Sequence, residues 1–264
     1  MPTYQDDTSA FDQVISQGYE FKMGYYFSEG WQIFRQQMWA FWGFTLLATL
    51  ALALVAQFPI LGAFAQIFLG GVMYAGLFIV ANNIRKGKAF EFSDFFRGTD
   101  DVLQLGLTQL VTGLIAILPM LLTFLLAFDY SKAWALYTRE MTDPNEISEF
   151  ALSLFTDWRI YVGLLATIFL SLLYIFALPL VALGRLKFWP AMEVSRKTVS
   201  QQWWNFLLMN VLFTPVLLIG LLVLCLGIYA AMAYMYCVIY VAYTDIYQVE
   251  GSSAENIIDE IGSN

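Results

Sequence analysis

Residues 160–183 have the sequence IYVGLLATIFLSLLYIFALPLVAL, without a charged side chain. As an α-helix this stretch is about 36 Å long, enough to cross the roughly 30 Å hydrocarbon core of a bilayer. One charge at mid-bilayer costs about 2.5 to 3.5 kcal/mol on insertion scales, so uncharged intervals mark where a chain can cross. The stretch therefore predicts one transmembrane helix.

Three further uncharged intervals extend the same argument to the rest of the chain. They separate Arg35 from Arg85 by 49 residues, Asp101 from Asp129 by 27, and Lys197 from Asp245 by 47. Since one crossing needs about 20 residues, the shortest of the three holds one helix and each longer one holds two, joined by a tight turn. The predicted spans are residues 39–57, 61–83, 103–127, 160–183, 204–223 and 227–244.

Composition indicates that lipid is the solvent for most of the chain. Of the 264 residues, 59% are hydrophobic and only 13% are charged, against about 25% charged in soluble proteins. The apolar runs are continuous rather than alternating, which excludes a transmembrane β-barrel. We therefore expect an all-α polytopic membrane protein, with a membrane domain over residues 24–247 between solvated acidic tails at residues 1–23 and 248–264.

The distribution of basic residues predicts the orientation. Ten of them fall on one side of the six spans: Lys22, Arg35, Arg85, Lys86, Lys88, Arg97, Arg185, Lys187, Arg196 and Lys197. The other side receives only Lys132, Arg139 and Arg159, so the positive-inside rule puts both termini in the cytoplasm. We expect a bacterial inner membrane protein. The net charge of −8 argues against a nucleic-acid partner.

A short motif occurs twice, at the start of each long uncharged interval. Gln36-Gln37-Met38-Trp39-Ala40-Phe41 returns 165 residues later as Gln201-Gln202-Trp203-Trp204-Asn205-Phe206. Leading into the first copy, Phe27, Trp31, Phe34 and Met38 form a helical stripe suited to the cytoplasmic interface. We interpret the chain as three hairpins in one orientation, each preceded by an amphipathic interfacial segment. The alternative is that aromatic interface segments look alike by necessity.

The segment before the middle hairpin is Phe90-Glu91-Phe92-Ser93-Asp94-Phe95-Phe96-Arg97-Gly98. Ser93 is a candidate N-cap, and Phe92, Phe95 and Phe96 fall on one side of the predicted helix. This segment matches the other two only weakly in sequence, so its assignment as a third lead rests on its position before a span.

Three stretches together resemble a known group of proteins. They are Glu29-Gly30-Trp31-Gln32-Ile33-Phe34, Phe92-Ser93-Asp94-Phe95-Phe96-Arg97-Gly98 and Trp189-Pro190-Ala191-Met192-Glu193-Val194-Ser195. Over about residues 24–247 the chain resembles uncharacterised bacterial six-helix membrane proteins, a group that includes YciC-like proteins and the membrane domain of some glycerophosphodiester phosphodiesterases. The resemblance implies a fold of six spans. Its motifs are structural, and they transfer no catalytic residue.

The residue types leave little room for catalysis. The chain has no histidine, which excludes Ser-His-Asp and Cys-His arrangements and the commonest metal and haem ligand. The predicted spans carry no Asp, Glu, Lys or Arg, so a proton relay inside the membrane has only tyrosines as titratable members. We expect no cofactor and no enzymatic activity.

Three intramembrane features are candidate sites. The first is a tyrosine stripe on one face of the last span, formed by Tyr229, Tyr236, Tyr240, Tyr243 and Tyr247. It could line a groove for a lipid or dock a partner helix, or the tyrosines could satisfy one another within the bundle.

The second feature is a polar edge in the third span, formed by Gln104, Thr108 and Thr112. It could line a wet vestibule or make ordinary interhelical hydrogen bonds. The third is a small-residue patch in the second span, Gly71 and Ala75, where helix backbones can approach closely. Internal packing explains this patch more readily than dimerisation does.

Three functional hypotheses follow. The first is a non-catalytic accessory or assembly component of a membrane complex or envelope, which contacts membrane lipids and binds partner proteins through its interfacial segments or its C-terminal tail. The second is a transporter or lipid-handling protein for a neutral or amphipathic molecule, which uses the tyrosine stripe. The third is a membrane enzyme, for which only loop carboxylates are available as acids or bases.

Overall fold

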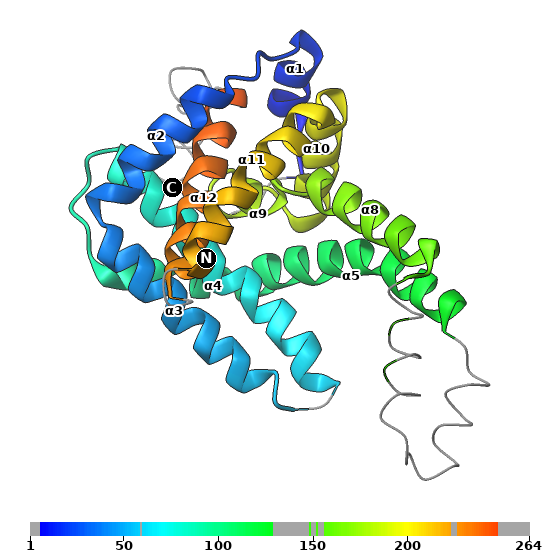
Figure 1. Ribbon diagram of the computed structural model, residues 1–264. Coiled ribbons are helices and arrows are strands. Elements are labelled where there is room, and N and C mark those ends of the chain that lie inside the picture. The colour runs from blue at the N-terminus through cyan, green and yellow to red at the C-terminus, as the bar shows by residue number, and fades with distance from the viewer. Residues whose placement is uncertain are drawn as a thin grey trace. The chain divides into compact units, whose positions relative to one another are not determined.

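The structure is a computed structural model that describes residues 6–58, 60–128, 148, 152, 156–222 and 226–247. It divides into two compact units: residues 1–112 with 172–264, and residues 113–171. The described residues are predominantly helical (Figure 1). The C-terminal segment 248–264 and most of the loop after residue 128 lie outside the described residues.

Among the residues that the structure describes, six helices are long and apolar enough to cross a membrane, which agrees with the predicted number of spans. They are α3 (Met38–Val55), α4 (Leu61–Arg85), η1 with α5 (Phe92–Ala127), α8 with α9 (Trp158–Ala182), α11 (Trp203–Leu222) and α12 (Gly227–Ile246). The predicted ends are correct to within a few residues except where η1 (Phe92–Asp101), a 3₁₀-helix, continues directly into α5 (Val102–Ala127). The protein is thus a multi-pass α-helical membrane protein.

A lead helix precedes each hairpin, as predicted. These leads are α2 (Met23–Gln36), η1 and α10 (Phe188–Gln201). Both boundaries of α10 lie 165 residues after those of α2. The residues that follow, Gln37 and Gln202, share an unusual backbone conformation, with φ/ψ of −134/41° and −137/35°. The repeated glutamine motif therefore marks one structural feature, a break between a lead helix and a span.

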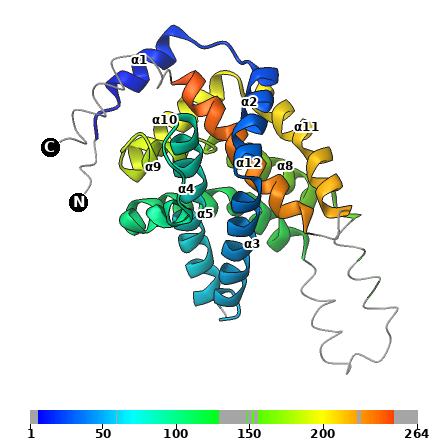
Figure 2. The same ribbon diagram turned by 90° about the vertical axis from the view of Figure 1, so that its left-hand side faces the viewer.

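The leads pack in a cyclic pattern within the first unit. Each lead lies against the second span of the preceding hairpin: η1 against α4, α10 against α9 (Ala177–Ala182), and α2 against α12. Figures 1 and 2 both show α2 beside α12. The first lead therefore contacts the last span, and this contact closes the cycle.

The buried face of α2 differs from the predicted stripe. Tyr26, Gly30, Ile33 and Phe34 are buried, whereas Trp31 is 47% exposed. Phe27, Trp31 and Phe34 of the predicted stripe all lie against the ring of Tyr234 on α12, so the stripe borders the buried face and takes part in the same contact. Gly30 permits this contact, since a Cβ there would lie 2.8 Å from a methyl group of Val238.

The start of η1 also differs from the sequence prediction. Glu91, not Ser93, occupies the N-cap position, and its backbone N–H donates to Asp94 Oδ2 at 3.3 Å. Phe95 alone of the three phenylalanines is fully buried, and it stacks on Phe44 with ring centroids 4.4 Å apart. Phe92 and Phe96 also lie against Phe44 of α3, with ring centroids 6.4 and 5.5 Å away, so the three phenylalanines share one contact as predicted although only Phe95 is fully enclosed.

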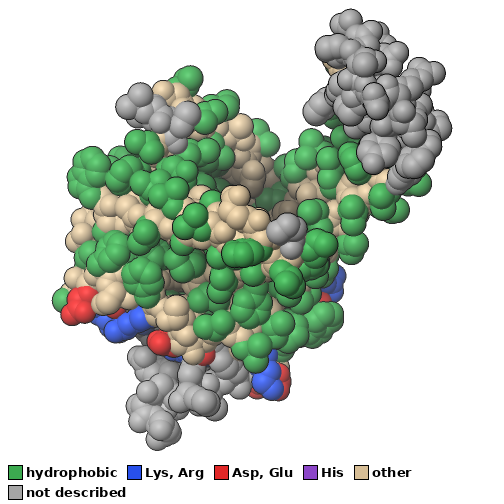
Figure 3. Space-filling view, turned by 90° about the horizontal axis from the view of Figure 1, so that it is seen from below, with side chains coloured by type: hydrophobic (Ala, Val, Ile, Leu, Met, Phe, Trp, Pro, Cys, Tyr) green, Lys and Arg blue, Asp and Glu red, His purple; other side chains and the backbone are tan. Residues whose placement is uncertain are grey.

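The buried core of the first unit lies toward the C-terminal ends of α4 and α12. In α4 most residues from Gly70 to Asn83 are buried, whereas Gly62 is the only buried residue before Gly70. In α12 every residue from Cys237 to Thr244 is buried. The C-terminal half of α3, the first turn of α4 and the C-terminal half of α11 expose leucine or phenylalanine side chains instead. Figure 3 shows hydrophobic side chains over most of the face in view, with charged side chains gathered along one edge.

The second unit, described by itself, contains the distal part of α5 and most of α8 (Trp158–Leu173). These helices run side by side where Gly163 meets Thr123, since a Cβ on Gly163 would lie 2.0 Å from the threonine hydroxyl. Nearby, Arg159 Nη1 donates to the Leu126 carbonyl at 3.0 Å. These two contacts hold the middle hairpin together at its far end.

Candidate functional site

The tyrosine stripe of α12 is internal to the first unit rather than open to lipid. Tyr240, Tyr243 and Tyr247 are at most 2% exposed, while Tyr229 and Tyr236 are half-buried. Tyr236 stacks on Tyr74 of α4 with ring centroids 5.4 Å apart. The stripe thus packs against protein over its C-terminal half.

The hydroxyl groups of these tyrosines have different environments. Tyr240 donates to Asn82 Oδ1 at 3.1 Å, and Tyr247 lies 2.8 Å from Thr198 Oγ1 of α10. Thr198 already uses its hydroxyl hydrogen on the Val194 carbonyl, so Tyr247 donates in that pair. The Tyr243 hydroxyl is buried beside Gly184 and has no hydrogen-bond partner among the described residues.

Beyond the stripe, a polar cluster that the sequence analysis missed joins the end of α12 to α2 and α4. Asp245 accepts from Lys22 Nζ at 3.1 Å and from the Tyr26 hydroxyl at 2.9 Å. Burial raises the pKa of Tyr26, so its hydroxyl remains a donor at physiological pH. Asp245 was visible in the sequence only as the end of an uncharged interval.

Arg85, the last residue of α4, extends this polar cluster. Its guanidinium donates to Thr244 Oγ1 at 3.3 Å and to the Tyr25 hydroxyl at 3.1 Å. Charged and hydroxyl groups of three helices therefore meet where α4 and α12 both end. Such an arrangement fixes the helices relative to one another, since each charge has a specific partner.

The polar edge predicted as a vestibule is used in hydrogen bonds within the protein. Gln104 Oε1 accepts from the Phe188 backbone N–H at 3.0 Å, which ties α5 to the start of α10. Thr108 and Thr112 donate to carbonyls one turn earlier, at 2.7 and 2.8 Å. Thr108 is 1% exposed. Only the Gln104 hydrogen bond joins two helices, while those of Thr108 and Thr112 stay within α5.

The small-residue patch lies against η1 and the start of α5. A Cβ on Gly71 would lie 2.4 Å from the Leu105 carbonyl oxygen, and Ala75 is fully buried. Gly76 beside them faces the Phe95 carbonyl oxygen even more closely, at 1.8 Å from the position of its absent Cβ. The patch is therefore a site of close packing inside one molecule.

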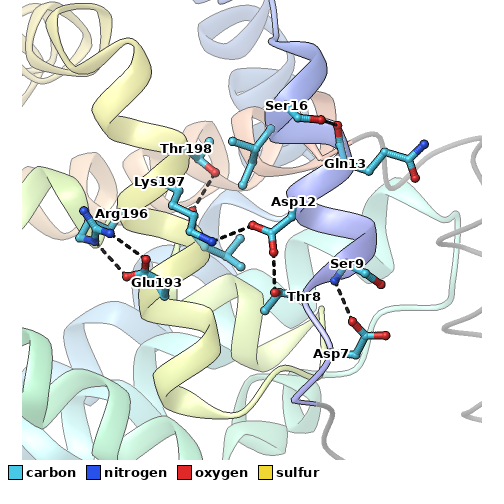
Figure 4. A network of polar contacts seen from close by, with 12 residues as sticks. Asp7, Thr8, Ser9, Asp12, Gln13, Ser16, Glu193, Arg196, Lys197 and Thr198 are labelled. Atoms are coloured by element: carbon cyan, nitrogen blue, oxygen red, sulfur yellow. Dashed lines mark hydrogen bonds and ion pairs between the residues drawn. The ribbon is translucent and has the colours of Figure 1, made fainter.

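The N-terminal segment, predicted as a solvated tail, instead forms helix α1 (Ser9–Gln17) on the surface of α10. Asp12 pairs with Lys197 at 2.9 Å, as Figure 4 shows, and the Tyr19 hydroxyl donates to the Thr198 carbonyl at 2.8 Å. A hydrogen bond from Thr8 and the neighbouring Lys197 lower the pKa of Asp12. The acidic composition of the N-terminal segment did not predict this contact, because its lysine partners lie about 180 residues away in sequence.

No family model matches the chain, and neither a curated protein nor a solved structure is similar to it. The fold therefore defines the class of protein, a six-span α-helical membrane protein, without a relative that assigns a role to any residue.

Tyrosine-to-phenylalanine variants of α12 should differ according to their hydroxyl partners. Tyr247→Phe removes the donor to Thr198 and should lower the free energy of unfolding by about 1 kcal/mol. Tyr243→Phe removes a buried hydroxyl without a described partner and should leave stability unchanged or raise it. Reversible unfolding in mixed micelles measures both. Equal losses would contradict the assigned environments.

Proposed function

We propose that this protein is a non-catalytic accessory or assembly component of a membrane complex or envelope, located in a bacterial inner membrane. The observation that carries the proposal is the burial of the tyrosine face, because it was the strongest sequence candidate for a ligand groove. Its hydroxyls and rings contact α4 and α10 instead. The stripe therefore supports a structural role in the helix bundle.

The outer surface supplies the area that such a role needs. On α11, Val211, Leu218 and Ile219 are all more than half exposed, and on α3 so are Leu50 and Leu54. Exposed aliphatic side chains in a spanning helix contact lipid or the helix of another membrane protein. A stable partner would cover one of these surfaces.

The transport or lipid-handling alternative requires an open tyrosine face. In this structure only Tyr229 and Tyr236, in the N-terminal half of the stripe, retain partial exposure. A ligand that reached Tyr240 would have to separate it from Asn82. The geometry therefore favours the accessory role over this alternative.

Native mass spectrometry after extraction in mild detergent tests the accessory role. We expect a defined protein partner in stoichiometric amount. If the partner binds α11, tryptophan at Val211 or Leu218 should abolish the complex while tryptophan at Leu54 on α3 leaves it intact. If the partner binds α3, the effects of these substitutions should be exchanged. A monomer that carries only lipid, in several detergents, would contradict the proposal. Bound neutral lipid lost on Tyr236→Phe would favour the lipid-handling alternative.

Reporter fusions test the proposed orientation. Alkaline phosphatase fused after Phe128, at the end of the α5 span, should be active, because that position is proposed to lie outside the cytoplasm. The same enzyme fused after Lys88 should be inactive, and a fluorescent protein at the C-terminus should fluoresce. Activity after Lys88 and none after Phe128 would show the opposite orientation.

A further inference from the structure

The contact between the N-terminal segment and α10 is formed by complementary charges. Before Lys22 the chain carries Asp6, Asp7, Asp12 and Glu20 and no basic residue. Asp6 pairs with Lys187 at 2.6 Å and Asp12 with Lys197 at 2.9 Å. Lys187 is the N-cap residue of α10 and Lys197 lies in its C-terminal half, so the acidic segment runs along most of that helix.

The contact between α1 and the rest of the protein buries few side chains. Ile15 is the only buried residue of α1, and both ion pairs are exposed, with Asp6 at 68% and Asp12 at 39% of their side-chain surface. Exposed ion pairs contribute little and weaken with salt. The remaining contacts are uncharged: Gln201 and Gln202 donate to the carbonyls of Ile15 and Tyr19, the Tyr19 hydroxyl donates to the Thr198 carbonyl, and Phe11 packs against Tyr247. A competing anion can therefore replace the carboxylates without disturbing the core.

The surface under this segment has the character of a membrane interface. Trp189 in the first turn of α10 is 64% exposed, and Trp204, just beyond its last turn, is 68% exposed. Exposed tryptophans at span ends prefer the headgroup level of a bilayer. Lysines at this depth attract anionic lipid headgroups, and the same headgroups repel an acidic segment.

We infer that residues 6–19 form a releasable acidic strap, and that anionic phospholipid headgroups displace it from Lys187 and Lys197. The strap carboxylates occupy the positions that lipid phosphates take once the strap leaves. The docked fraction of the strap therefore depends on the anionic lipid content of the surrounding membrane. This inference rests on the membrane fold alone and holds for the purified protein, whatever partner it has in the cell.

Distance measurements between spin labels test the strap directly. Ser16→Cys on α1 and Ser200→Cys on α10 place labels at two exposed positions, in a background where Cys225 and Cys237 are alanine. In nanodiscs of phosphatidylcholine we expect one short distance. When phosphatidylglycerol replaces part of that lipid at constant ionic strength, the ratio of docked to released strap should fall by about fivefold for each lysine that changes partner.

A charge-swapped variant is the matched control. Asp12→Lys combined with Lys197→Asp preserves the ion pair but reverses its polarity, so phosphatidylglycerol should no longer release the strap to the same extent. The same distance distribution in both lipids for the unswapped protein, whether short or long, would overturn the inference. So would an equal response of the swapped variant.

Discussion

Replacing Gly76 with alanine is expected to lower the free energy of unfolding by about 3 kcal/mol, at the upper end for overpacked cores. The added Cβ would lie 1.8 Å from the Phe95 carbonyl oxygen and 2.7 Å from its carbonyl carbon. Both are backbone atoms of η1, so no side-chain rotation relieves the clash. The two elements must separate, which also loosens the stack of Phe95 on Phe44.

Gly43→Ala is the matched control, because a Cβ at this position in α3 has nothing within 4 Å. Alanine is preferred to glycine in a helix, so this variant should gain up to about 1 kcal/mol. Reversible unfolding by detergent titration, followed by circular dichroism, compares the two. Similar stability changes of the same sign would mean that η1 does not contact α4 in this way.

Ser195→Ala is expected to cost about 2 to 6 kcal/mol. The Ser195 side chain is fully buried, and its hydroxyl donates to the Leu173 carbonyl at 2.8 Å and accepts from the Phe176 N–H at 3.1 Å. These two backbone groups lie where α8 ends and α9 begins. Without the hydroxyl both remain buried and unpaired, at about 1 to 3 kcal/mol each.

Ser200→Ala tests whether the cost comes from this position rather than from the residue type. Ser200 lies one turn further along α10, is exposed, and donates only to the Lys197 carbonyl at 3.0 Å. Its replacement should change stability by less than about 0.5 kcal/mol. The same unfolding assay measures both variants. A Ser195→Ala protein as stable as Ser200→Ala would contradict the role of the Ser195 hydroxyl in joining the Leu173 carbonyl to the Phe176 N–H.

The six spans could be predicted from sequence because the cost of a charge in lipid is local. The uncharged interval from Ile160 to Gly184 already contains the information that places α8 and α9 in the membrane. The glutamine motif was equally informative, since Gln37 and Gln202 adopt the same break between helices. Neither inference needed to know which helix lies beside which.

The site could not be predicted in the same way, because its partners are distant in sequence. The spacing of the five tyrosines puts them on one face of α12, but the sequence does not reveal that Asn82 and Thr198 are the partners of two of their hydroxyls. Likewise the pattern of α2 could not indicate that α12 covers this helix, where Gly30 lies against Val238. Periodicity identifies a helical face but not its neighbour.

The N-terminal segment shows how composition alone can mislead. Four acids before Lys22 are typical of a solvated tail, and the apolar residues among them are too few for a core. Phe11 nevertheless packs edge-on against Tyr247, with ring centroids 5.6 Å apart. Asp6 and Asp12 pair with Lys187 and Lys197, which in the sequence served only to predict the orientation of the spans.

The contact of α2 with α12 sets a condition on biosynthesis. The Tyr26 hydroxyl donates a hydrogen bond to Asp245, which is synthesised 219 residues later. The Phe27 carbonyl accepts one from Tyr234, which is synthesised 207 residues later. While the ribosome makes the intervening chain, the face of α2 around Gly30 has no native partner. The native contacts of α2 can therefore form only after α12 has been made. A chain that stops short of α12 exposes this face of α2 to chaperones and proteases.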